Sequence, residues 1–70
     1  MDNKSFGQIL RMLRHEKGLT QIALSKMLNV TDRSIRDWEN ENIEPSYATL
    51  GKLIKIFDVT AGQLLGFEEY

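Results

Sequence analysis

The sequence predicts an all-α fold, a compact bundle of five helices. Apolar residues recur at steps of three and four along the chain, and no segment alternates between apolar and polar residues as a strand would. Each periodic stretch follows a serine or threonine, residue types that cap helix N-termini. These cap residues are Ser5, Thr20, Thr31, Ser46 and Thr60. Because the chain is short and contains no linker, repeat or low-complexity stretch, residues 1–70 are expected to form a single domain.

The first helix is expected over residues 5–17, where Gly18 provides a C-terminal stop. Its apolar stripe consists of Phe6, Ile9, Leu10 and Leu13. Between residues 20 and 40, two short helical patterns are separated by Asn29, which tolerates the left-handed conformation. Two helices joined by a turn of three or four residues form a helix-turn-helix motif.

The last two helices follow a loop. Pro45 disfavours helical geometry at the residue before it, so residues 41–45 are expected to be irregular. A fourth helix is expected over residues 47–57 and a short fifth helix over residues 61–65.

The second helix of the motif, over residues 31–40, has one apolar and one polar face. Its large apolar residues are Ile35 and Trp38, three positions apart. The opposite face carries Asp32, Arg33, Arg36, Asp37 and Asn40. In the major groove a guanidinium can bond guanine, an Asn amide adenine and a carboxylate cytosine. The pattern therefore predicts base reading in double-stranded DNA.

Spacing alone leaves an alternative open for the same charged residues. Asp32 with Arg36, and Arg33 with Asp37, are four positions apart and could form two exposed ion pairs of about 0.2–0.5 kcal/mol each. The first pair has the favourable order, with the acid nearer the helix N-terminus. Arg33 is therefore expected to be the freer arginine and the better candidate for a base contact.

Composition argues against catalysis and membrane insertion. The chain has no cysteine and one histidine, His15, which lacks partners for a metal site or a nucleophilic relay. We therefore expect no enzymatic activity, no metal, no cofactor and no small-molecule ligand. The sequence shows no apolar stretch long enough to span a membrane and no signal peptide, so the cytoplasm is the expected location.

Charge is distributed unevenly along the chain. The net charge is −1, whereas DNA-binding domains are often strongly basic. Residues 1–40 hold seven basic and five acidic residues, and residues 41–70 hold two basic and five acidic residues. Positive charge is thus concentrated where the motif lies, and we expect weak sequence-independent binding.

The chain resembles the lambda-repressor and Cro-like helix-turn-helix family, the xenobiotic-response-element type of transcriptional regulators, over residues 6–65. The matching positions are Arg14, Gly18 to Gln21, Leu24, Asn29 to Thr31, Ile35, Trp38, Glu39, Pro45, Ser46, Val59, Thr60, Leu64 and Leu65. The resemblance implies a DNA-binding regulator, with a repressor as the expected type. It also implies a homodimer on a palindromic operator, with reading helices about 34–36 Å apart.

The resemblance also implies residue roles. Five positions match ones that face the DNA groove, namely Thr31, Asp32, Arg33, Arg36 and Asp37, and the last four are expected to read bases. Contacts to the DNA backbone are expected from Thr20, Gln21, Thr31 and Asn40. An ion pair between Arg14 and Glu39 should tie the first helix to the third, and Trp38 should lie in the core.

The sequence departs from the family in the loop. Glycine is common at the position of Glu41, and basic residues are common before Pro45, whereas this chain has Glu41 and Glu44. Two carboxylates near phosphates should weaken binding. Ser25 replaces the usual alanine where the two motif helices approach, and its hydroxyl can bond back along the helix.

A dimer interface is expected at the C-terminal end, formed by Leu64, Leu65 and Phe67, because a chain of this length has a thin core. A frayed tail would explain the same exposed residues. The alternative function is a protein-interaction module, such as an antitoxin or an anti-repressor partner. Its contacts would come from Met12, Ile43, Phe67 and Tyr70.

Overall fold

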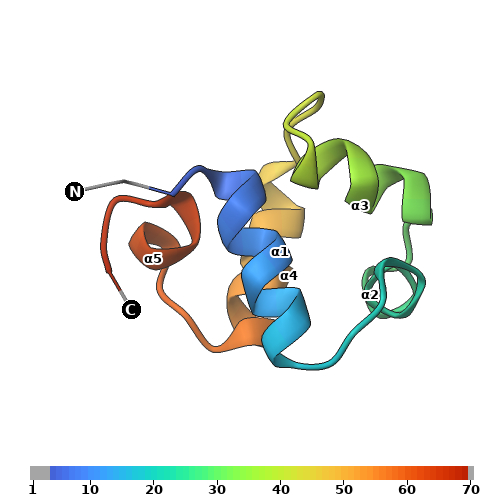
Figure 1. Cartoon of the computed structure of the whole chain (residues 1–70), viewed down its shortest axis with the longest axis horizontal. Helices are drawn as coiled ribbons and strands as arrows, with labels where there is room; N and C mark the ends of the chain where they lie inside the picture. Colours follow the sequence, from blue (N-terminus) through green and yellow to red (C-terminus); the bar gives the residue numbers. More distant parts are fainter. Residues whose placement is uncertain (1–3, 70) are drawn as a thin grey trace.

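The computed structural model describes residues 4–69, which contain five helices and no strand. In chain order these are α1 (Phe6–Glu16), α2 (Gln21–Leu28), α3 (Asp32–Glu39), α4 (Tyr47–Phe57) and α5 (Ala61–Leu65). The predicted all-α, five-helix fold is confirmed, and the bounds of α4 and α5 are those predicted (Figure 1). Tyr70, a suggested protein contact, lies outside the described residues.

All five helices begin at the predicted cap residue. In each case the serine or threonine oxygen accepts a hydrogen bond from the backbone N–H three residues later. Gln8 and Gln63 add the reciprocal bond to the backbone of Ser5 and Thr60, which completes capping boxes on α1 and α5. An N-cap of this kind contributes about 1 kcal/mol, so local sequence accounts for where the helices start.

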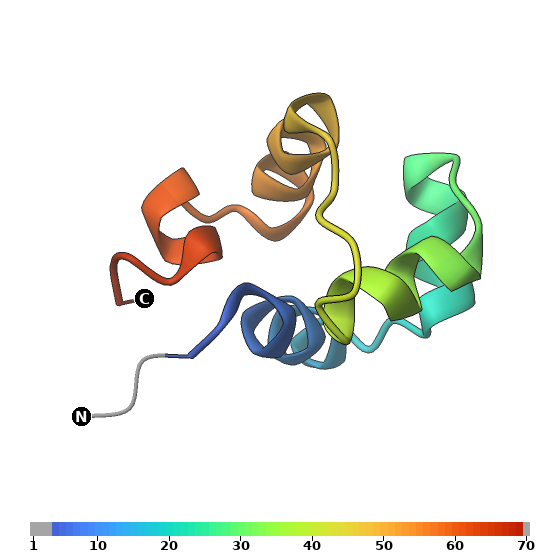
Figure 2. The ribbon, with the colours of Figure 1, turned by 90° about the horizontal axis from the view of Figure 1, so that it is seen from above.

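The hydrophobic core is shared by all five helices. Its buried apolar members are Ile9, Leu10, Leu13, Leu24, Leu28, Ile35, Trp38, Leu53, Phe57 and Leu64. Figure 2 shows the α2–α3 pair at one end of the molecule and α5 at the other, with α1 and α4 between them. Helix α3 packs against α2 and α1, and α5 packs against α1 and α4. Trp38, 6% exposed, is a core residue as predicted.

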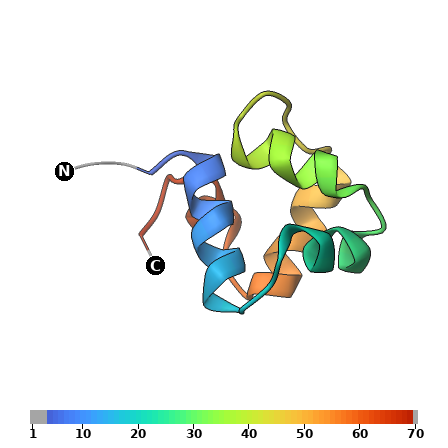
Figure 3. The same cartoon turned by 45° about the vertical axis from the view of Figure 1, so that its right-hand side comes forward.

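The turn between α2 and α3 sets the angle of the helix-turn-helix motif. Asn29 adopts the left-handed conformation, φ 58°, as its residue type predicted. The Val30 N–H then donates to the Ser25 carbonyl over 2.9 Å, and the Ser25 hydroxyl donates to the Ile22 carbonyl over 2.6 Å. Figure 3 shows the short turn that joins the two helices, and in Figure 1 α2 is seen nearly end-on while α3 is seen from the side, so α3 lies across α2.

One glycine permits the close approach of α1 to the end of α3. A Cβ atom added at Gly7 would overlap the Glu39 carbonyl oxygen and would lie 2.9 Å from Cγ of Glu41. Gly7 is buried, and the sequence offered no reason to single it out. A side chain at this position would force the two helices apart.

The structure corrects one residue of the expected dimer interface. Leu64 is 0% exposed and belongs to the core, so it cannot contribute to a surface patch. Its neighbour Leu65 is 37% exposed and Phe67 is 83% exposed. A five-residue helix is too short for periodicity to indicate which of two adjacent leucines points inward.

Helices α1 and α3 end in the same backbone motif with different residues. After α1, Gly18 has φ 67°, and the N–H groups of Gly18 and Leu19 donate to the carbonyls of His15 and Arg14. After α3, Glu41 has φ 62°, and its N–H donates to the Trp38 carbonyl. This is the Schellman motif, in which glycine avoids the strain that a Cβ atom brings to the left-handed conformation. Glu41 has a Cβ atom, so its backbone is locally strained in this conformation.

Replacing Glu41 with Gly should raise the free energy of unfolding by about 1 kcal/mol, because it removes the left-handed strain. Glu44→Gly is the matched control, since Glu44 is also an exposed loop carboxylate but has no positive φ. Urea unfolding of both variants measures the difference. An equal effect in the two variants would assign the gain to charge and contradict the backbone explanation.

Candidate nucleic-acid interface

The polar face of α3 is exposed while its apolar face is buried. The side chains of Arg33 and Arg36 are 81% and 48% exposed, whereas Ile35 is 0% exposed on the opposite side. Arg36 Nη1 lies 2.6 Å from Asp32 Oδ2, and Arg33 Nε lies 3.9 Å from Asp37 Oδ2. Both ion pairs of the alternative interpretation therefore occur, and Arg33 is the freer arginine, as expected.

These ion pairs do not prevent the arginines from binding another group. Exposed pairs at this spacing contribute only about 0.3–0.5 kcal/mol. The four residues predicted to read bases thus share one accessible face, with two guanidinium groups and two carboxylates available on it.

The residues predicted to contact the DNA backbone lie at helix ends. Thr20 caps α2, where its hydroxyl accepts from Ala23 N over 2.9 Å. Thr31 caps α3, where its hydroxyl accepts from Ser34 N over 3.1 Å. Gln21 is the first residue of α2, and Asn40 is the exposed C-cap of α3. Helix N-termini present free N–H groups that favour anions, so the α2 and α3 starts suit phosphate.

Arg14 and Glu39 form the expected ion pair between α1 and α3. Arg14 Nε and Nη2 donate to Glu39 Oε2 and Oε1 over 2.6 and 3.0 Å, which is a bidentate arrangement. The side chains are 9% and 0% exposed. Arg14 Nη1 also donates to the Leu19 carbonyl over 2.9 Å, so the same guanidinium holds the segment that enters α2.

Two further side chains reach the Glu39 carboxylate. Gln21 Nε2 donates to Oε1 over 3.1 Å, and Arg11 Nε donates to the same atom over 3.4 Å. Sequence reasoning did not place Gln21 against Glu39 and missed Arg11 entirely. The signal for Arg11 was its position one helical turn before Arg14.

The pKa of Glu39 is lowered below its ordinary value. Burial alone would raise this pKa, but hydrogen bonds from Arg14 and Gln21 and the positive charge of Arg14 outweigh the effect of burial. Glu39 is therefore ionised at neutral pH. No buried side-chain polar atom in the described part of the chain lacks a hydrogen-bond partner.

The loop after α3 is exposed and acidic. Residues 41–44 are all exposed, and Ile43 is 58% exposed between the two glutamates. The loop begins directly after Asn40, so its carboxylates lie beside a predicted backbone contact. Among residues 4–69 no group of His, Cys, Asp and Glu could hold a metal ion, and no helix is long and apolar enough to cross a membrane.

The fold and this exposed face define a helix-turn-helix domain. Residues 10–64 match the family model HTH_3, described as helix-turn-helix, and the chain belongs to this family. The proteins found by comparison are named as transcription regulators or as a repressor, and none of them is named as an enzyme.

Two curated relatives match over most of this chain. It is 38% identical to the HTH-type transcriptional activator BcrR of Enterococcus faecalis over 64 residues, and 31% identical to the HTH-type transcriptional regulator ImmR of Bacillus subtilis strain 168 over 65 residues. These alignments cover 91% and 93% of this chain. The chain spans 31% of the length of BcrR and 51% of the length of ImmR.

Two solved structures have the same fold. The P22 c2 repressor in complex with synthetic operator 9T, in the presence of Tl⁺, superposes with a TM-score of 0.85 at 29% identity, covering 93% of this chain and 98% of that one. The solution structure of the P22 c2 DNA-binding domain gives a TM-score of 0.82 at 30% identity, covering 94% and 87%. The expected lambda-repressor-like fold is confirmed.

Replacing Glu39 with Gln should lower the free energy of unfolding at neutral pH by about 3 kcal/mol, because it leaves the buried Arg14 guanidinium without its carboxylate. Since the folded pKa of Glu39 is lowered, the wild-type ion pair contributes fully above the ordinary value of 4.5 and is lost as the pH falls through the folded pKa. The variant should therefore lose less stability than the wild type between neutral pH and acid.

Urea unfolding as a function of pH measures both effects. Glu16→Gln, which removes an exposed carboxylate from the end of α1, is the control and should change neither the stability nor its pH dependence much. Parallel pH profiles for the wild type and the Glu39 variant would contradict the role assigned to this ion pair.

Proposed function

We propose that this chain is a sequence-specific regulator of transcription that binds double-stranded DNA as a homodimer on a palindromic operator and acts as a repressor. The observation that carries the proposal is the exposed α3 face, with Arg33 and Arg36 outward, on a helix fixed from behind by Ile35, Trp38 and Glu39. Occupying an operator is sufficient for repression, so repression needs no surface beyond those that bind DNA and join the two copies.

The proposed base contacts use the polar side chains of α3. Arg33 bonds guanine O6 and N7, while Arg36 exchanges its contact with Asp32 for a base or a phosphate. Asp32 and Asp37 accept from cytosine N4 or keep the arginines oriented. The two ion pairs on α3 in the free protein are weak and exposed, so contacts with DNA can replace them at little cost in free energy.

The proposed contacts to the DNA backbone lie at the start of α2 and at the two ends of α3. Thr20 and Gln21 at the start of α2, and Thr31 and Asn40 at the two ends of α3, hold phosphates on either side of the groove. These contacts fix the register of α3 and carry no sequence information.

The proposed dimer surface uses exposed apolar residues near α5. Leu65 lines an apolar groove of about 180 Å³ between α4 and α5, together with Leu50 and Ile54. Tyr47 at the edge of this groove is 93% exposed, and Phe67 is 83% exposed. A two-fold contact would cover these side chains in both copies. Leu64 also lines this groove, but it is 0% exposed and belongs to the core.

A protein-interaction module is the second candidate function. The exposed Ile43 within an acidic loop favours it, since such a surface would suit a basic protein partner. Binding to duplex DNA separates the two functions, because a protein-interaction module binds no duplex, whereas contacts to several phosphates release counterions and give duplex binding that weakens steeply as salt rises.

Selection from random duplexes, followed by affinity measurements on the selected site, tests the proposed function. Arg33→Ala should cost about 1–3 kcal/mol on that site and relax the preference at one base pair. Gln21→Ala should instead weaken binding to all duplexes alike. If Arg33→Ala also acts uniformly, Arg33 is a phosphate contact, and if no duplex is selected the DNA-binding proposal fails.

Sedimentation of the chain at micromolar concentration tests the dimer. The double variant Leu65→Asp with Phe67→Asp should be monomeric and folded, because both side chains are exposed. Leu64→Ala is the contrast, and should lower stability by about 2–5 kcal/mol as a core truncation. A wild type that is monomeric both free and on a full operator would contradict the dimer.

A further inference from the structure

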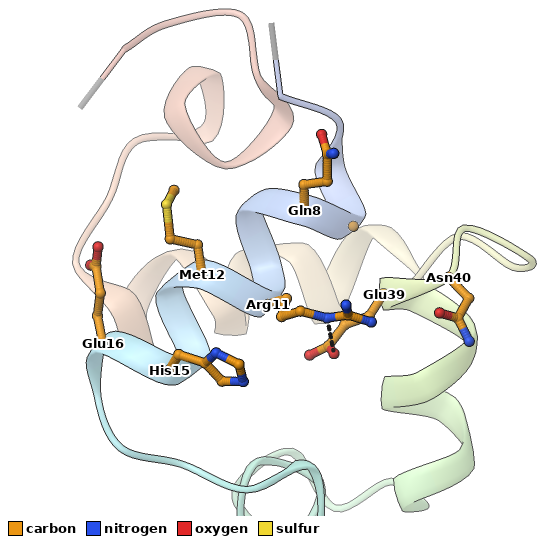
Figure 4. A pocket seen from close by; sticks show the side chains of 8 residues that line it. Gln8, Arg11, Met12, His15, Glu16, Glu39 and Asn40 are labelled. Carbon is orange, nitrogen blue, oxygen red and sulfur yellow. Dashed lines mark hydrogen bonds and ion pairs between the residues drawn. The ribbon is translucent and has the colours of Figure 1, made fainter. Parts of the chain in front are cut away.

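A groove beside α1 lies next to the motif and is lined by no residue of α2 and by none of the four proposed base-reading residues of α3 (Figure 4). It has a volume of about 660 Å³ and runs between α1 and the C-terminal end of α3. Gln8, Arg11 and His15 line it from α1, and Asn40 lines it from the end of α3. Asn40 is one of the predicted backbone contacts, so the groove adjoins the expected path of a DNA strand.

Arg11 is the least constrained member of the network around Glu39. Its side chain is 53% exposed, and its contact with Glu39 Oε1 is the longest of three to that atom, at 3.4 Å. The other two donors are Arg14 Nη2 at 3.0 Å and Gln21 Nε2 at 3.1 Å. A carboxylate oxygen offers two lone pairs, so Arg11 competes for an acceptor that is already satisfied.

The charges of the network leave Arg11 with only a share of one carboxylate, that of Glu39. The buried carboxylate of Glu39 is neutralised by the bidentate guanidinium of Arg14. The remaining acid that lines the groove, Glu16, lies at the end of α1 farthest from Asn40 (Figure 4). The positive charge of Arg11 therefore lines the groove with only a weak carboxylate partner.

The geometry places Arg11 close to both neighbouring backbone contacts. Arg11 and Gln21 donate to one and the same oxygen atom, so their donor groups are adjacent. Asn40 lines the same groove as Arg11. A phosphate bound at Gln21 would thus lie near the Arg11 guanidinium, and a phosphate bound at Asn40 would border the groove that Arg11 lines.

We propose that Arg11 binds a phosphate of the DNA backbone and so extends the DNA-binding surface from the motif onto α1. This inference rests on the proposed DNA-binding function. The guanidinium gives up its long contact with Glu39 and presents its Nη edge to the phosphate, whose oxygens fit the planar fork. Because Arg14 and Glu39 join α1 rigidly to α3, a phosphate held by Arg11 also fixes how α3 enters the major groove of the DNA.

Binding of Arg11→Gln to a random-sequence duplex, measured over a range of salt concentrations, tests this inference. Loss of one phosphate contact should reduce the slope of log K against log salt by about 0.9, and should weaken binding about five- to tenfold at about 0.1 M salt. The weakening should be the same for selected and random duplexes. Arg11→Lys keeps the charge and should keep the slope.

Lys55→Gln is the matched control, since it removes the same charge from an exposed position on α4, which does not line the groove. A slope for Arg11→Gln equal to that of the control would overturn the inference and leave the proposed function standing. A loss confined to one sequence would also overturn it, because Arg11 would then read a base. A wild type that binds no duplex would overturn both.

A measurement on the wild-type protein covers the case in which Arg11→Gln does not fold. The NMR resonance of the Arg11 Nε–H should shift when a random-sequence duplex is added, as the contact with Glu39 is exchanged for phosphate. An unchanged resonance in a chain that binds the duplex would overturn the inference.

Discussion

The orientation of the exposed helix depends on a single buried carboxylate. Glu39 is the last residue of α3, and its two oxygens receive a guanidinium from α1 and an amide from α2. Three helices are thereby fixed at one point, and Arg14 adds the segment before α2 through the Leu19 carbonyl. Removing water from a charge is costly, so this arrangement is stable only when all partners are in place. It therefore favours one relative placement of the three helices over neighbouring ones.

The backbone around this point is adapted to the same placement. Gly7 lets α1 touch the carbonyl of Glu39, and Asn29 turns the chain between α2 and α3 in the left-handed conformation. Glu41 adopts the left-handed conformation too, although a glycine would do so without strain. A residue with a Cβ atom in this conformation lowers stability, and its carboxylate would repel a phosphate that lay beside Asn40. The loop is therefore a candidate for contact with something other than DNA.

The helices could be predicted from the sequence because the residues that determine where each helix begins lie next to it in the chain. Cap residues and apolar spacing located the start of every helix, and Pro45 located the loop. The resemblance supplied the pairing of Arg14 with Glu39, which helix periodicity alone does not indicate. Contacts between helices could not be predicted: Gly7 faces Glu39, Arg11 and Gln21 share its oxygen, and Leu64 points inward. Each of these contacts depends on how the helices are placed relative to one another, and no pattern in a single sequence indicates that placement.

Both arginines on the polar face of α3 have a carboxylate partner of their own in the free protein. Arg33 and Arg36 face Asp37 and Asp32. When this face binds DNA, it therefore exchanges one set of ionic contacts for another and adds little net attraction to an arbitrary duplex. A sequence that offers good acceptors to the arginines and donors to the aspartates recovers more than the exchange costs, because both members of each pair then gain a partner. A domain of net charge −1 can in this way bind a particular site while its attraction to other DNA stays weak, which raises the ratio of specific to non-specific binding.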